Sequence, residues 1–434
     1  MPTTTRYRHR WAALAVLLTA EAMNLLDATI VQVAGPVIHA GLPGPAADIP
    51  WFSAAYTLPF AAFLITGGRL GDILGRARVF KIGVTAFVLA SLVCAAAPDA
   101  GLLIGARAVQ GAASALIIPQ TIGLIRALFD GDELAKALGS IGPVMGLSAV
   151  TGPLLGGLLT QALSWRAVFL VNVPLGLVVL LAARFLREDK AATRPKLDLV
   201  GTVLVVAGAG LLVYPLISPA GTSWPLLAAG AALLVVFGFQ QRRTAAPLVE
   251  PSLFAHRGFP AALAGSLLYF AVMTGLMLLV PMRLQLGEGV DVRTASLTLL
   301  PLSAGLAVSS WFAGSWLVPK FGARVMFAGL ALLLAGILGV AGGVTPALAL
   351  CGLGMGMFTV PFFTAALHRV RPHETGSAAG LLNAVQQLGG TLGVALLGGL
   401  YLSTGTATTA FGVAAGLTVA AAVAVIPLSS RRAR

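Results

Sequence analysis

The chain has 434 residues, of which 58% are hydrophobic and only 10% are charged. A soluble domain is about 25% charged and 45–50% apolar, so this composition excludes soluble, disordered and fibrous proteins and indicates an integral membrane protein. The net charge of +13 fits a nucleic-acid binder only if the bases gather on one folded surface. The two cysteines, Cys94 and Cys351, lie in separate apolar runs and predict neither a disulfide nor a metal site.

Fourteen apolar runs have lengths near the ~20 residues that a helix needs to cross a hydrocarbon core of ~30 Å. Their connections are short and rich in proline and glycine, and they leave no room for a soluble domain. We therefore expect an all-α membrane protein with fourteen transmembrane helices. The expected spans are 11–34, 51–70, 79–97, 101–125, 136–162, 166–186, 199–217, 225–240, 258–282, 293–316, 324–343, 346–367, 376–400 and 407–428.

Lysine and arginine gather on one side of this topology. All but four of the 28 lie in the termini or in the connections that follow even-numbered spans. The exceptions are Arg166, Arg283 and Arg293 on the opposite side and Arg107 inside a span. Because basic residues are concentrated in cytoplasmic loops, this bias predicts a cytoplasmic-membrane protein with both termini in the cytoplasm. It also explains the positive charge without a nucleic-acid partner.

The first span contains two acids, Glu21 and Asp27. At ~1.5 Å per residue, Glu21 lies near the midplane of the span and Asp27 in its outer third. At ~100° per residue the two carboxyl groups point about 120° apart, with Asn24 between them, so the helix carries one broad polar face. An ionised acid at the bilayer centre costs at least ~2.5–3.5 kcal/mol, which makes each acid a functional candidate. The residues leave open which of the two carries a proton.

The link between the second and third spans reads GGRLGDILGRARVF (67–80), and the link between the tenth and eleventh reads GSWLVPKFGARVMF (314–327). The two stretches share glycine, leucine, glycine and phenylalanine at matching positions, although Pro319 replaces Asp72 in the second. A repeat on the same side of the membrane is typical of secondary transporters built from two halves. It predicts six helices in 1–190, a two-helix insert in 191–250, and six helices in 251–434.

Further polar and small residues lie inside later spans. Arg107 in the fourth span requires a carboxylate or several carbonyl groups as partners. Small residues at one-turn spacing in the fifth span allow helices to pack backbone to backbone; they are Gly152, Pro153, Gly156 and Gly157. A second polar set could line a central cavity or only form hydrogen bonds between helices; it comprises Asn24, Tyr56, Gln110, Gln120, Asn383, Gln386 and Gln387.

Several phrases occur in a fixed order along the chain. They are LDATIVQVAGPVI in the first span, the 67–80 stretch, RAVQGAASALIIP in the fourth span, GLSAVTGPLLGGLL in the fifth and GSAAGLLNAVQQLGGTLGVA in the thirteenth. Together they resemble the major facilitator superfamily in its fourteen-helix branch of drug:proton antiporters, over nearly the whole chain. The resemblance implies proton-coupled efflux of small amphipathic molecules by alternating access. We expect a monomer in the lipid bilayer that is not an enzyme and needs no cofactor or metal.

The resemblance also implies roles for individual residues. Proton coupling would fall to Asp27 and Arg107, with Glu21 favoured by its depth. The 67–80 stretch would act as a latch that closes the cytoplasmic ends of the two halves in the outward-facing state, through Gly68, Asp72, Gly75 and Arg76. The glycines and Pro153 of the fifth span would form a tight seam that prevents leakage of the proton gradient.

Alternative functions remain for the same sequence. An uptake symporter would share the fold, and a non-transporting membrane sensor belongs to another class. An intramembrane enzyme is disfavoured because the five histidines lie at or outside the ends of the spans and no HExxH motif is present. An ATP-driven pump is disfavoured because the chain has no P-loop.

Overall fold

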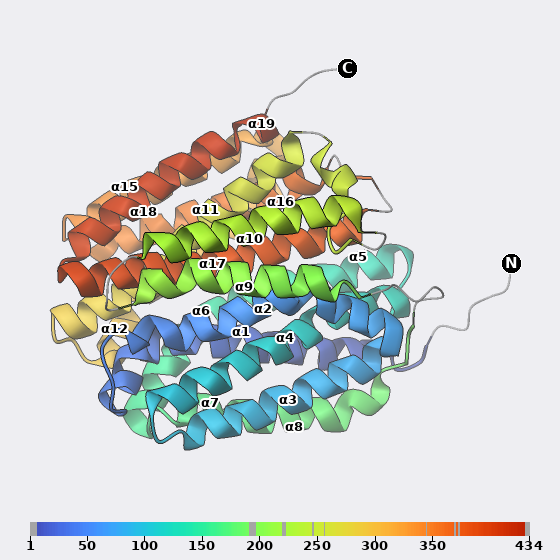
Figure 1. The fold of residues 1–434 in the computed structure, drawn as a ribbon, viewed down its shortest axis with the longest axis horizontal. Helices are drawn as coiled ribbons and strands as arrows, with labels where there is room; N and C mark the ends of the chain where they lie inside the picture. Colours follow the sequence, from blue (N-terminus) through green and yellow to red (C-terminus); the bar gives the residue numbers. More distant parts are fainter. Residues whose placement is uncertain are drawn as a thin grey trace, which may run out of the picture.

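A computed structural model describes residues 7–190, 197–218, 223–244, 247–255, 257–343, 345–368, 370–371 and 374–429. Within these residues the regular structure is helical, and fourteen helical segments are long and apolar enough to cross a membrane. Figure 1 shows the long helices lying side by side. Because the number of spans is even, the first span begins and the last span ends on the same side, which we call the side of the termini. The prediction of an all-α membrane fold with fourteen spans is confirmed.

The first six spans form a bundle that we call the first bundle. Its helices approach closely where glycines remove side chains: a β-carbon on Gly67 of α2 or Gly111 of α4 would overlap a backbone carbonyl of the other helix. The elements are α1 (Arg10–Ala40), α2 (Asp48–Leu74), α3 (Arg76–Ala96), α4 (Ala100–Leu128), α5 (Gly131–Gly139), α6 (Ile141–Ala162), α7 (Ala167–Leu170), α8 (Asn172–Ala182) and a 3-10 turn, η1 (Ala183–Phe185).

Two helices follow as an insert, α9 (Leu199–Ile217) and α10 (Trp224–Arg243). They pack on each other through glycines, since a β-carbon on Gly230 would lie only 2.8 Å from the carbonyl oxygen of Gly208. Helix α9 contacts α2 on one side and α17 on the other, whereas α10 packs on α9 and is largely exposed. Figure 1 shows α9 and α10 side by side along the outside of the two bundles.

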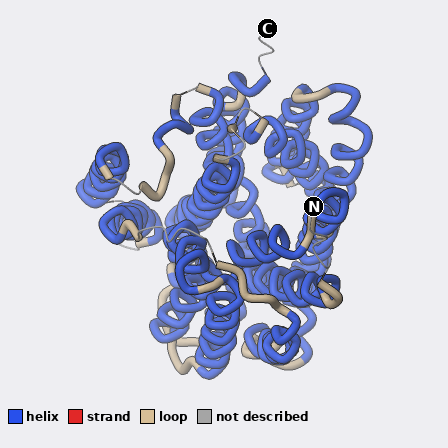
Figure 2. The backbone as a smooth tube through the Cα atoms, turned by 90° about the vertical axis from the view of Figure 1, so that its right-hand side faces the viewer, coloured by secondary structure: helices blue, strands red, loops and turns tan. Residues whose placement is uncertain are grey.

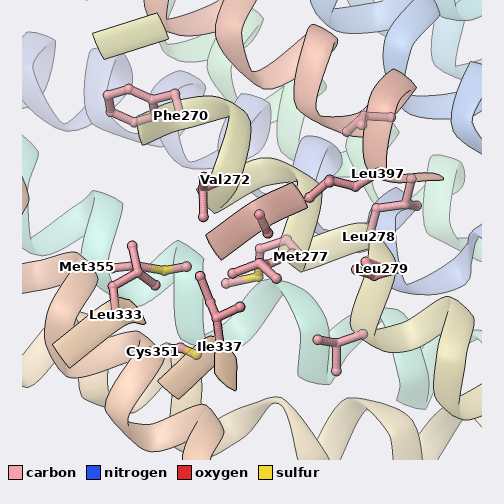
Figure 3. Close-up of a cluster of buried hydrophobic side chains, with 14 of the residues drawn as sticks. Phe270, Val272, Met277, Leu278, Leu279, Leu333, Ile337, Cys351, Met355 and Leu397 are labelled. Carbon is pink, nitrogen blue, oxygen red and sulfur yellow. The ribbon is translucent and has the colours of Figure 1, made fainter. Parts of the chain in front are cut away.

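The last six spans form the second bundle, whose core is shown in part in Figure 3. Figure 2 shows the helices of both bundles surrounding the middle of the molecule. The elements are η2 (Pro251–Phe254), α11 (Gly258–Met282), η3 (Arg283–Gly287), α12 (Val292–Thr298), α13 (Leu300–Phe312), η4 (Ala313–Leu317), α14 (Val318–Phe321), α15 (Arg324–Ala341), η5 (Thr345–Ala347), α16 (Leu348–Leu367), α17 (Thr375–Thr404), α18 (Ala407–Ala424) and α19 (Ile426–Ser429).

The two bundles contact each other through α1, α2 and α6 on one side and α11, α12, α13 and α17 on the other. Hydrogen bonds cross between them within the part of the chain that the structure describes: the Gln285 amide donates to the Val33 carbonyl at 3.0 Å, and the Thr391 hydroxyl donates to Thr57 at 2.7 Å. Val33 lies near the C-terminal end of α1, and Gln285 lies just beyond the C-terminal end of α11. The interface is also apolar, since Val33, Ile49 and Ala54 belong to a core that includes residues of α11 and α17.

Candidate functional site

A buried ion pair joins α1 to α4 in the first bundle. Asp27 and Arg107 are each 0% exposed, and an Arg107 Nη1 group donates to Asp27 Oδ2. The same nitrogen donates to Gln110 Oε1 at 2.6 Å, and Arg107 Nε donates to the Phe52 carbonyl at 2.9 Å. A guanidinium in lipid is stable only with such partners. The structure thus supplies both the carboxylate and the carbonyl that Arg107 requires.

The second oxygen of Asp27 is held by two amides. Asp27 Oδ1 accepts hydrogen bonds from Gln110 Nε2 at 3.0 Å and from Asn172 Nδ2 at 2.8 Å. Both amides also donate to the Ser91 hydroxyl, at 2.8 and 3.3 Å. Arg107, Gln110 and Asn172 all donate to the Asp27 carboxylate, whereas the Ser91 hydroxyl accepts from the two amides and donates to the Phe87 carbonyl. Helices α1, α3, α4 and α8 meet at this one carboxylate.

A second set of hydrogen bonds continues from this pair toward α2. The Ser114 hydroxyl donates to Asn24 Oδ1 at 2.6 Å and lies 2.9 Å from the Tyr56 hydroxyl. The Tyr56 ring lies below the Arg107 guanidinium, 4.4 Å from its central carbon, in a cation–π contact. Of the residues that the sequence suggests for a cavity, Asn24, Tyr56 and Gln110 therefore belong to one buried cluster with Asp27 and Arg107.

Glu21 lies on α1 in the half of the helix nearer the termini, and it is 9% exposed. Within the described residues it makes no hydrogen bond or ion pair. Burying an isolated charge is costly, so this carboxyl group differs from that of Asp27, whose charge is paired. The two acids of α1 therefore occupy different environments, one paired and one alone.

The other proposed cavity residues lie elsewhere. Gln120 is fully buried, and its amide donates to the Gly67 carbonyl at 2.8 Å, which ties α4 to α2. The α17 residues lie in the second bundle, are half-buried and make none of the hydrogen bonds of the Asp27 cluster within the described residues; they are Asn383, Gln386 and Gln387.

The predicted latch residues lie together where α2 turns into α3. Asp72 accepts hydrogen bonds from Arg76 Nη2 at 2.8 Å and Nε at 3.1 Å. Gly75 has a φ of 109°, which favours glycine, and Gly68 lies against α4. Arg76 Nη1 also donates to Asp189 Oδ2 at 2.9 Å, so this loop binds the segment that follows α8.

The glycines of the fifth span lie where α6 contacts α1 of its own bundle and α12 of the second bundle. A β-carbon on Gly152 would overlap the Thr29 hydroxyl of α1, and one on Gly156 would lie 3.2 Å from the Ile30 carbonyl. A β-carbon on Gly157 would overlap the Ser296 hydroxyl of α12, in the second bundle. Pro153 is buried in the same stretch. Larger side chains at these positions would push α6 away from α1 and α12.

Sequence reasoning missed three members of the Asp27 cluster: Asn172, Ser91 and Ser114. Asn172 is fully buried, and its Oδ1 has no hydrogen-bond partner among the described residues. The available signal is a single amide in the apolar run VFLVNVPLG (168–176), since an uncompensated amide in a membrane span is expensive. Ser91 and Ser114 give no comparable signal, because serine is common inside membrane helices.

Two helical bundles, fourteen spans and a buried charge cluster define a multi-pass membrane transporter. Residues 17–394 match the model of the Major Facilitator Superfamily, and the chain belongs to that family, in its drug-efflux branch. It is accordingly a transporter rather than an enzyme, as predicted.

Similar proteins of this family are named for the transport of an antibiotic or for resistance to one. The chain is 43% identical over 421 residues to the probable actinorhodin transporter of Streptomyces coelicolor, covering 91% of this chain and 73% of that protein. It is 37% identical to the puromycin resistance protein pur8 of Streptomyces alboniger, covering 96% and 88% of the two chains. A crystal structure of the human organic anion transporter MFSD10 (TETRAN) has a TM-score of 0.64 at 14% identity, covers 96% and 99% of the two chains, and shows the fold alone.

Proposed function

We propose that the protein is a proton-coupled antiporter that exports small amphipathic molecules across the cytoplasmic membrane by alternating access. The observation that carries the proposal is the fully buried Asp27–Arg107 pair with its complete set of donors. Intramembrane ionisable groups are expensive and mark proton or ion pathways in transporters. Relatives named for the transport of, or resistance to, actinorhodin and puromycin support export of antibiotic-like molecules.

The cluster supports exchange in the following way. Ionised Asp27 binds Arg107, Gln110 and Asn172, which ties α1 to α4 and α8. A proton on Asp27 removes its charge and with it the strongest link, while Arg107 keeps Gln110, the Phe52 carbonyl and the Tyr56 ring. The guanidinium keeps these hydrogen bonds when the carboxylate is neutral, but it loses its counter-charge. Protonation would thus weaken the contact between α1 and α4 and shift the conformational equilibrium.

The remaining residues complete this proposal. Glu21, unpaired and nearer the termini, would take up a second proton or bind a cationic group of the substrate. The half-buried amides of α17 would face the substrate from the second bundle; they are Asn383, Gln386 and Gln387. The α2–α3 loop with Asp72 and Arg76, and the glycine contact of α6 with α1 and α12, would close opposite ends of the substrate pathway in alternation. The termini lie in the cytoplasm and the protein acts as a monomer in this proposal.

The test uses purified protein in liposomes with an imposed pH gradient and puromycin as the probe. We expect the parent to move puromycin against its gradient, and Asp27→Asn to lose this activity while retaining downhill puromycin exchange. Glu21→Gln serves as the comparison, since it removes the other carboxyl group of the same helix.

Three results would count against the proposal. Gradient-driven transport that survives in both single variants and in the double variant would show that α1 carries no proton. Accumulation rather than exclusion of puromycin by cells that express the parent would favour the uptake symporter, and no movement of a broad drug panel would favour a sensor.

A further inference from the structure

The connection that enters the two-helix insert is bound to the α2–α3 loop of the first bundle. The Ala77 backbone N–H donates to Glu188 Oε1 at 3.0 Å, at the N-terminus of α3. The Arg76 backbone N–H donates to the Asp189 carbonyl at 2.9 Å, and its side chain binds the Asp189 carboxylate at 2.9 Å. A carboxylate at a helix N-terminus is favoured by the helix dipole. The entry connection is thus held by one cap and two bonds to Arg76.

The start and the end of the insert are joined at one buried carboxylate. Asp198 is 7% exposed and caps α9 by accepting from the Gly201 backbone N–H at 2.8 Å. It also accepts from Gln240 at 3.0 Å and from Gln241 at 2.6 Å, both at the end of α10. The Gln241 side-chain carbonyl in turn accepts from the Val249 backbone N–H at 3.1 Å. These bonds make the base of the insert one connected unit.

This unit is bonded to α2 at two further points. The hydroxyl groups of Thr66 in α2 and Thr202 in α9 lie 2.9 Å apart and are both buried. The Arg69 side chain donates to the Pro247 carbonyl in the exit connection. Both connections and α9 itself are therefore attached to the first bundle by directional polar bonds.

The contact of the insert with the second bundle is different in kind. Val213 and Ile217 of α9 belong to the apolar core that includes residues of α11 and α17. Gly399 of α17 lies against the Leu216 backbone, where a β-carbon would overlap the Leu216 carbonyl. Among the described residues, the hydrogen bonds that α9 and α10 make to neighbouring spans lead to α2 of the first bundle. An apolar face with a glycine opposite it has no directional bonds to break when the surfaces slide.

We propose that the insert moves with the first bundle as a rigid part and slides over α17 during transport. Glu188, Asp189 and Asp198 are positioning residues that keep the insert attached. Because α9 contacts both α2 and α17, it covers the line where the two bundles meet and excludes lipid there as they move. The buried bonds of Asp198, Thr66 and Thr202 lie in a low-dielectric interior and are costly to break, and the more exposed bonds of Glu188 and Asp189 add directional attachment. Apolar contacts, by contrast, are not directional. The inference rests on the alternating access of the proposed function.

Spin-label distances test which bundle the insert follows. The labels are placed on the exposed residues Val235 of α10, Leu89 of α3 and Val419 of α18, after both native cysteines are replaced by serine. We compare acidic and alkaline buffer and expect the Leu89–Val419 distance to change between states. The Val235–Val419 distance should change with it, and the Val235–Leu89 distance should change by less than a third as much.

Other results each have a definite meaning. A Val235–Leu89 distance that changes as much as the distance between the bundles would overturn the inference. A Leu89–Val419 distance that stays single under all conditions would refute alternating access, and with it the proposed function rather than the attachment of the insert alone. Replacing Glu188 and Asp189 by Gln and Asn should broaden the Val235–Leu89 distribution, and an unchanged distribution would remove their positioning role.

A disulfide between α2 and α9 gives a second test. The two threonine hydroxyls lie 2.9 Å apart, so Thr66→Cys and Thr202→Cys place two sulfur atoms near each other, and disulfide formation is first verified by the loss of free thiol. We expect the cross-linked protein to keep at least half of the parental puromycin transport, because α9 and α2 move together. Thr66→Cys alone is the control for the substitution. A loss of transport that a reducing agent reverses would show that α9 must leave α2, and the inference would fail.

Discussion

The Asp27–Arg107 pair can be divided experimentally into what it does for stability and what it does for coupling. The perturbations are Asp27→Asn, Arg107→Met and the double variant. Both side chains are at most 1% exposed, so removing one partner leaves an uncompensated buried charge and costs about 3–5 kcal/mol. The double variant buries no charge at this site, and replacing a buried pair by neutral groups is often close to neutral in free energy. We therefore expect the free energy of unfolding of the double variant to be several kcal/mol higher than the value that adding the two single losses would give.

The assay is unfolding in detergent micelles, with gradient-driven puromycin transport measured on the same preparations. In Asp27→Asn, Arg107 keeps only Gln110, the Phe52 carbonyl and the Tyr56 ring as partners, and its charge is not compensated. We therefore expect this variant to unfold most easily of the four proteins. All three variants should lack gradient-driven transport, including the double variant whose stability recovers. Strictly additive stabilities would show that the two charges do not interact. A double variant that pumps would show that the pair is structural only.

Two further predictions concern the surroundings of this pair. Asn172→Leu removes a 2.8 Å hydrogen bond to Asp27, and a hydrogen bond to a charged group contributes about 1.5–3 kcal/mol. Gradient-driven efflux should therefore fall about tenfold or more while downhill exchange persists. Equal losses in both assays would contradict a role in coupling. Gly157→Ala places a β-carbon 2.7 Å from Ser296 Cβ, so it should lower the free energy of unfolding by about 1–3 kcal/mol and slow transport. Gly412→Ala meets nothing within 4 Å and serves as the control. Similar behaviour of the two alanine variants in transport and unfolding would show that the contact of α6 with α12 tolerates extra volume.

The spans could be predicted because lipid imposes a length and a polarity that the sequence must meet everywhere. Even the shortest expected span, 225–240, corresponds to a helix, α10. The helical repeat also predicts that Glu21 and Asp27 point in different directions, and the structure gives them different environments. Local periodicity is enough for such statements, because they concern one helix at a time.

The partners of Asp27 could not be predicted in the same way. Asn172 lies 145 residues from Asp27 in the chain, and their contact depends on how α1, α3, α4 and α8 pack. The attachment of Glu188 and Asp189 to α3 was equally hidden, since acids in a charged connection look like solvated residues. Such contacts are set by the relative placement of helices, on which one sequence carries little information.

The buried pair also has a consequence for how the chain is made. Asp27 and Arg107 are 80 residues apart, and at about 5–20 residues per second the ribosome needs roughly 4–16 s to produce the second after the first. During that interval α1 has its carboxyl group but α4 has not been synthesised. An unpaired ionised carboxylate in the bilayer is costly in free energy, so we expect α1 to enter the bilayer with a neutral acid or to remain beside the insertion machinery until α4 has been synthesised. The first four helices are therefore expected to leave the translocon as a group, and a change at Arg107 would already act during biosynthesis.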